Sequence, residues 1–243
     1  MPSRLVRAAC LALALTAPAV AARAGDLADF NAAMETVSAH NRVAIGYLRT
    51  GNADLASLEL DRLRAAWSKV GERFAGKRPD PFDGNPRYVT AFTDIAMRLI
   101  TADMMLNSNR PDNARDALIA VRDDLYDLRK SAGIVVLADC VRDSNTAMDA
   151  LMVYNDRALD WSKSDTRYDI AAKAAIYGHE VARCDGMASQ AVRKDADFRR
   201  LVDGVKASLT NIPKAIAERD TGLLHRVLIE LRAFDNLLAF RFG

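Results

Sequence analysis

The feature that most constrains the fold is an apolar rhythm that runs along nearly the whole chain. Hydrophobic residues recur at alternating steps of three and four, the spacing that places side chains along one face of an α-helix. Only 12 glycines and 7 prolines occur among the 243 residues. The pattern predicts an all-α protein with eight amphipathic helices, at residues 27–48, 56–74, 88–106, 114–128, 137–152, 170–188, 198–216 and 224–238.

Short polar breaks separate these helices. Thr50–Asn52, Asn107–Asn109 and Asp220–Gly222 each supply turn or helix-capping residues. Connections this short force consecutive helices to run antiparallel. The seventh helix contains Pro213, which lacks a backbone N–H and is expected to kink that helix or split it near Leu209.

The second half of the chain matches the apolar pattern of the first when the sequence is shifted by 110 residues. One shift aligns two consecutive helices, which favours an internal duplication, although any two heptad helices also align by sliding. We therefore expect two tandem antiparallel four-helix bundles, at residues 25–132 and 133–243. A continuous α-solenoid of helical hairpins is the alternative. The aligned pairs include Tyr88 with Phe198, Ile95 with Val205, Leu118 with Leu228, Arg122 with Arg232 and Leu128 with Leu238.

The first 24 residues have the three-part composition of a secretory signal peptide. Arg4 and Arg7 form a positive head, and an apolar run follows from Ala8 to Val20. Ala22-Arg23-Ala24 then matches an A-x-A cleavage sequence. The run is too short and wrongly flanked for a membrane span. We expect a periplasmic or secreted protein, cleaved near Ala24.

Removal of this segment changes the charge of the chain. Arg4, Arg7 and Arg23 leave with it and no acid does, so the net charge falls from +2 to −1. The remaining 219 residues contain no block of like charge and no second apolar run of about 20 residues. This composition indicates neither a nucleic-acid partner nor a membrane span. The expected partner is an unidentified protein or small ligand.

Cleavage would also leave two of the three cysteines, because Cys10 lies inside the signal. An even count in an oxidising compartment favours a disulfide between Cys140 and Cys184. The alternatives are two buried free thiols or one half of a metal site.

Histidine and methionine side chains supply candidate metal ligands. His40 lies beside Asn41 in the first helix, and one of the two must face the helix seam. Met34 lies on the same helix, and Met148 and Met152 lie one turn apart on the fifth. Imidazole and thioether groups bind copper, so a copper site is one interpretation of these four residues. The other interpretation is that the methionines fill gaps in the core and that the histidine donates to a backbone carbonyl.

The motifs of common catalytic and cofactor sites are absent from the sequence. It contains no Glu-x-x-His pair, Cys-x-x-Cys, Gly-x-Ser-x-Gly, His-Glu-x-x-His or glycine-rich phosphate loop. No grouping of acid, base and nucleophile is recognisable, and the cofactor, if there is one, is unknown.

The longest irregular segment runs from Gly76 to Pro86 and contains three prolines. Phe82 within it belongs to no apolar stripe, and Asp80 and Asp83 do not have the spacing of a calcium-binding loop. Long loops often carry function, so these three residues are candidates for a partner contact. The alternative is that the loop packs over one end of the first bundle.

A secreted helical bundle that ends in Phe240-Arg241 resembles the cytochrome c-prime family. Members of that family carry a haem-attaching Cys-x-x-Cys-His shortly before Phe-Arg. Here the corresponding stretch, Ala233–Leu237, lacks both cysteines and the histidine, so this alignment excludes covalent haem. Related b-type bundle cytochromes bind haem through a methionine in helix one and a histidine in the last helix. Met34 matches the methionine, but the fourth helix contains no histidine. The resemblance implies a haem-less bundle and does not carry function.

These observations favour a non-enzymatic, exported helical-bundle protein that binds a partner or ligand through its bundle surfaces. A periplasmic haem or copper carrier is the alternative, and an enzyme with an unrecognised site is the third hypothesis.

Overall fold

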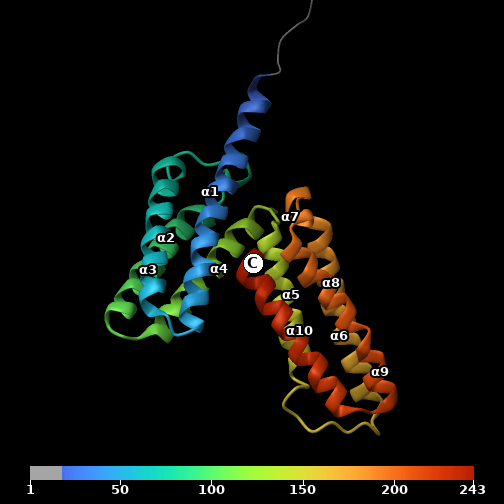
Figure 1. Cartoon of the computed structure of the whole chain (residues 1–243). Coiled ribbons are helices and arrows are strands. Elements are labelled where there is room, and N and C mark those ends of the chain that lie inside the picture. The colour runs from blue at the N-terminus through green and yellow to red at the C-terminus, as the bar shows by residue number, and fades with distance from the viewer. Residues whose placement is uncertain (1–17) are drawn as a thin grey trace, which may run out of the picture.

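The computed structural model describes residues 18–243, and it describes side-chain environments from residue 26 onward. Within this range the chain forms helices, turns and loops and no strand, so the all-α prediction is confirmed. The helices, shown in Figure 1, are α1 (Pro18–Arg49), α2 (Ala53–Phe74), the 3₁₀ helix η1 (Asp80–Phe82), α3 (Pro86–Asn107), α4 (Pro111–Ser131), α5 (Leu137–Met152), α6 (Ser164–Met187), α7 (Gln190–Lys194), α8 (Ala196–Leu209), α9 (Asn211–Glu218) and α10 (Thr221–Phe242).

The predicted signal peptide lies mostly outside the described residues. Residues 1–17 are not described, and residues 18–24 form the first turns of α1. Export and cleavage near Ala24 stay predictions. No helix in the described part of the chain combines the length and apolarity needed to cross a membrane.

The first four long helices form an up-down-up-down bundle. Each packs against the next, and α4 returns to contact α1. Their apolar stripes meet in one hydrophobic cluster that runs from Phe30 to Leu128. At one end of this core the Phe82 ring of η1 lies 5.1 Å from the ring centroids of both Phe30 and Tyr88, within the usual range for aromatic pairs.

The second bundle repeats this arrangement with α5, α6, the α8–α9 pair and α10 around a second cluster from Cys140 to Leu238. The expected break in the seventh helix is confirmed, because α8 ends at Leu209 and α9 begins at Asn211. Pro213 occupies the first turn of α9, where a missing N–H removes no helical hydrogen bond.

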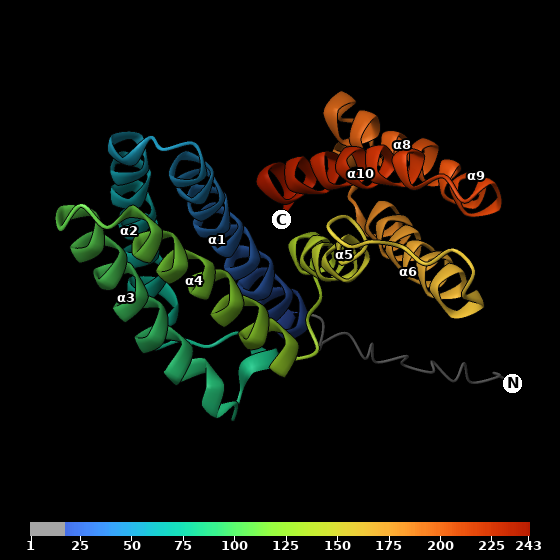
Figure 2. The ribbon, with the colours of Figure 1, turned by 90° about the horizontal axis from the view of Figure 1, so that it is seen from below.

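The two bundles diverge from a shared junction and form a V in Figure 1. Helices α1 and α4 of the first bundle face α5 and α10 of the second (Figure 2), and α1 contacts α10 directly. Two separate cores in the described chain favour tandem bundles over a continuous solenoid.

A buried carboxyl group interrupts the core of the second bundle. Asp235 on α10 is fully buried, and it accepts hydrogen bonds from Asn145 Nδ2 at 2.7 Å and Arg232 Nη1 at 3.3 Å. The Ser144 hydroxyl also stabilises the charged form of Asp235, and the Tyr177 hydroxyl is buried without a hydrogen-bond partner. Burial raises the pKa of Asp235 to about 6, and burial followed by the nearby Asp235 charge raises the pKa of Tyr177.

Replacing this carboxyl group should change how stability depends on pH. Because the folded-state pKa of Asp235 lies above its unfolded value, the folded protein binds a proton that the unfolded chain releases between about pH 4 and 6. The stability that Asp235 contributes is therefore present at low pH and lost as the pH rises through about 6. We expect the free energy of unfolding of Asp235→Asn, relative to that of the native protein, to rise by about 2 kcal/mol as the pH increases from 4 to 7.5. Urea unfolding at each pH measures this difference. A difference that stays constant over this range would contradict the assignment.

Candidate functional site

A cleft of about 380 Å³ lies between the two bundles, where α1 and α4 face α10. Its size falls within the usual range for a small-molecule site. Its lining combines arginine side chains with apolar ones and contains no carboxylate. The residues that line it are Arg42, Ile45, Gly46, Tyr47, Arg49, Thr50, Arg122, Asn236, Leu237, Ala239 and Phe240.

Helical spacing explains why α1 contributes two of the arginines. Ile45, Gly46 and Arg49 lie three, four and seven positions after Arg42, so the four residues share one face of the helix. The adjacent face, which includes Leu48, is buried in the first core. The helix therefore presents its cleft residues to α10 while it remains anchored in its own bundle.

Gly46 allows α10 to approach this face closely. A Cβ atom built on Gly46 would lie 2.7 Å from Phe240 Cδ2, and closer still to Cε2. Any side chain at this position would displace the Phe240 ring, so glycine is required for the observed packing. Phe240 and Leu237 remain partly exposed and form the apolar wall of the cleft opposite α1.

The positive charges of the cleft are incompletely paired. The Arg42 side chain is 11% exposed; its Nη1 donates to the Gly243 backbone oxygen at 2.7 Å and its Nη2 to Glu35 at 2.8 Å. Arg49 and Arg122 form no ion pair with any described residue, and Arg122 Nε is buried without a hydrogen-bond partner. Burial lowers the pKa of Arg122. The nearby Asp123 and Asp149 carboxylates oppose this shift, and the positive charges of Arg142 and Arg49 add to it.

A buried ion pair fixes the junction that shapes this cleft. Arg129 in the last turn of α4 donates through Nε to both carboxylate oxygens of Asp139, at 3.0 and 2.9 Å, and also through Nη2. Asp139 lies in the first turn of α5 and accepts from the Val136 N–H at 3.1 Å. The two side chains are only 6% and 4% exposed. The end of one bundle is therefore joined to the start of the next within ten residues.

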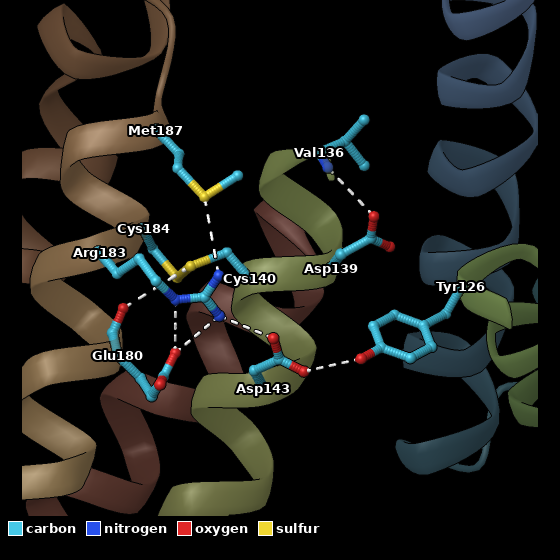
Figure 3. Close-up of a disulfide and its surroundings, with 9 residues drawn as sticks. All are labelled: Tyr126, Val136, Asp139, Cys140, Asp143, Glu180, Arg183, Cys184 and Met187. Atoms are coloured by element: carbon cyan, nitrogen blue, oxygen red, sulfur yellow. Dashed lines mark hydrogen bonds and ion pairs between the residues drawn. A yellow bond between two sulfur atoms is a disulfide. The ribbon is translucent and has the colours of Figure 1, made fainter. Parts of the chain in front are cut away.

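A second set of contacts joins the same helices along their length. Arg142 on α5 donates to Asp123 on α4 at 2.9 Å, and its guanidinium lies 4.0 Å from the centre of the Tyr126 ring. The Tyr126 hydroxyl reaches Asp143 across the gap between the bundles (Figure 3). Arg183 on α6 donates to the same Asp143, so the chain of contacts continues from α5 to α6 within the second bundle.

The predicted disulfide is confirmed. Cys140 on α5 and Cys184 on α6 are bonded, with their Cα atoms 5.4 Å apart (Figure 3). The bond closes a loop of 44 residues beside the junction, which on the chain-entropy account stabilises the fold by about 4 kcal/mol. It therefore ties α6 to α5, the helix against which α10 packs.

The four candidate metal ligands are not brought together. Met34 lies in the first core, whereas Met148 and Met152 belong to the second. His40 Nδ1 pairs with Glu59 on α2 at 2.8 Å, and its neighbour Asn41 is the residue that faces the seam, where it donates to the Leu118 carbonyl at 3.0 Å. Among the described residues, no three His, Cys, Asp or Glu side chains form a group suited to a metal ion.

The candidate partner loop requires a correction. Phe82 is fully buried in the first core, so it is not available to a partner, and the alternative that the loop packs over one end of the bundle describes its position. A buried aromatic cluster supplies the apolar surroundings that the helical stripes did not predict for it. Asp80 and Asp83 remain exposed at the same loop, and a partner contact there stays a prediction.

No family model matches this chain, and the comparisons with curated proteins and with solved structures also find no match. Nothing in them bears on the cytochrome resemblance.

Thiol titration checks the disulfide. Denatured, non-reduced protein that begins at residue 25 should contain close to no free thiol, and the full chain should contain one, from Cys10. After reduction the counts should rise by two in both proteins. Two free thiols in the shorter protein before reduction would contradict the bond.

Breaking the junction pair should strongly destabilise the fold. Asp139→Ala leaves the Arg129 charge buried and unpaired, which should cost about 3 to 5 kcal/mol in urea unfolding. The double variant Arg129→Met/Asp139→Leu removes both charges and should recover most of this loss. A cost below about 1 kcal/mol for Asp139→Ala would show that the pair is not buried in solution.

Proposed function

We propose that this chain is an exported, non-enzymatic protein that binds a small anionic molecule with an apolar body in the cleft between its two bundles. The observation that carries the proposal is the position of two arginines, Arg49 and Arg122, beside an apolar wall, with Arg122 Nε buried and without a hydrogen-bond partner. The predicted signal peptide and the disulfide support a location outside the cytoplasm.

The charges of the cleft define the polar part of the ligand. Arg122 is partly buried and its Nε has no hydrogen-bond partner, which costs free energy that a bound anion would offset. Arg49 is exposed and adds a second positive charge at the same cleft. Arginine presents its N–H groups as a planar fork that matches a carboxylate or phosphate with two parallel hydrogen bonds. A molecule with one such group therefore suits Arg49 and Arg122.

The walls define the rest of the ligand. Ile45 on α1 and Leu237 and Phe240 on α10 supply aliphatic and aromatic surface on both sides of the cleft. Burial of an apolar group between them contributes about 25 cal/mol for each Å² removed from water. An aromatic or branched aliphatic carboxylate combines both requirements.

The same chemistry favours binding over catalysis. Arginine stays protonated at all physiological pH values, so it neutralises and orients an anion but does not exchange protons with it. The lining contains no carboxylate, histidine or cysteine to act as a base or nucleophile. The cleft is therefore equipped to hold a ligand.

Calorimetric titration with 1-naphthoate tests the proposal. Arg122→Gln and Arg49→Gln should each weaken binding about tenfold, because each removes a charge-assisted hydrogen bond. Binding of the neutral analogue 1-naphthalenemethanol should be weak and should not change in either variant. Arg226→Gln is the matched control, because Arg226 is exposed on α10, away from the cleft lining.

Two outcomes would overturn the proposal. One is naphthoate binding that is equal in the native protein and in Arg122→Gln. The other is an equal loss in Arg226→Gln, which would indicate attraction to the general surface charge.

A further inference from the structure

A second groove, separate from the cleft between the bundles, lies within the second bundle between α6 and α9. Its volume is about 540 Å³, and most of its lining is apolar. Helix α6 contributes small side chains to the floor, and the end of α8 together with α9 contributes larger apolar ones to the wall. The floor comprises Ala171, Ala174, Ala175 and Gly178, and the wall comprises Leu209, Ile212, Pro213 and Ile216.

The break in the seventh helix accounts for the groove. Helix α8 ends at Leu209 and α9 begins at Asn211, so the axis is interrupted where it passes α6. Gly178 and Leu209 meet closely at this point, because a Cβ on Gly178 would lie 3.0 Å from Leu209 Cδ1. Beyond this contact the alanine side chains of α6 are too short to fill the space below α9, and apolar surface remains uncovered.

One cation stands at the edge of this groove. Arg167 Nη1 donates to the backbone oxygens of Trp161 and Ser162, and these bonds hold the guanidinium in place. Arg167 pairs with no carboxylate among the described residues, and its Nε and Nη2 have no hydrogen-bond partner there. That edge of the guanidinium presents two parallel N–H groups, the arrangement that binds a carboxylate with two hydrogen bonds.

The groove has no acidic lining residue, and Tyr168 beside Arg167 is 74% exposed. We propose that the α6–α9 groove binds the aliphatic chain of a fatty acid, with the carboxylate on Arg167. Charge complementarity at Arg167 selects the acid, and the floor of small side chains leaves room for its aliphatic chain. The groove shares no lining residue with the arginine-lined cleft, so either proposal can fail without the other.

Calorimetric titration of the full chain with dodecanoate, kept below its micelle concentration, tests the groove. Ala175→Leu places a large side chain on the floor and should weaken dodecanoate binding at least tenfold. Ala172→Leu is the matched control, because Ala172 is exposed on the same helix outside the groove, and it should bind as the native protein does.

Arg167→Gln tests the carboxylate contact separately. It should weaken dodecanoate binding about tenfold and leave dodecanol binding unchanged, because only the acid uses the guanidinium. Arg122→Gln, in the other cleft, should leave dodecanoate binding unchanged. Circular dichroism on each variant should show that the helices are intact.

Three results would overturn the proposal. Dodecanoate that does not bind, or that binds equally to native protein and Ala175→Leu, would show that the groove takes no chain. Equal loss of dodecanoate and dodecanol binding in Arg167→Gln would remove the carboxylate assignment. A concentration-dependent dimer that Ala175→Leu dissociates would identify the groove as an interface between two copies of this chain.

Discussion

The buried ion pair between Arg129 and Asp139 is the contact on which the arrangement of the two bundles depends. It joins the last turn of α4 to the first turn of α5, and only a few residues separate these helices. A desolvated pair tolerates little displacement, because any separation leaves two charges in a poorly hydrated environment. Arg142, Tyr126 and their carboxylate partners then extend the contact along the same two helices.

A fixed junction converts two surfaces into one site. The face of α1 that carries Arg42 and Arg49 would be an ordinary solvated surface if the first bundle stood alone. The approach of α10, made possible by Gly46, encloses that face and brings Phe240 against it. The disulfide supports the same geometry from the other side, because it ties α5 to α6 within the bundle that carries α10. The binding that we propose is therefore a property of the junction between the bundles.

Much of the fold follows from the sequence, because apolar periodicity reports directly on which helix face is buried. It located the eight long elements and the break beside Leu209. Periodicity did not predict the burial of Phe82, because that burial depends on ring contacts with Phe30 of α1 and Tyr88 of α3 and not on a stripe of its own. The 110-residue shift aligns Leu125 with the buried Asp235, a sign that the second core is polar where the first is apolar. Arg49 and Arg122 lie on polar faces, and periodicity cannot tell which polar faces meet across a junction.

The most direct test of this account is the distribution of distances between the far ends of the two bundles in solution. Nitroxides placed by non-cysteine chemistry at Asn52, in the α1–α2 turn, and at Lys214, in α9, report on that distance by pulsed electron spin resonance. A junction held by Arg129 and Asp139 predicts one narrow distribution in the native protein and a broad one in Asp139→Ala. A broad distribution in the native protein would contradict the account, because the arginines could not then form a single preorganised cleft.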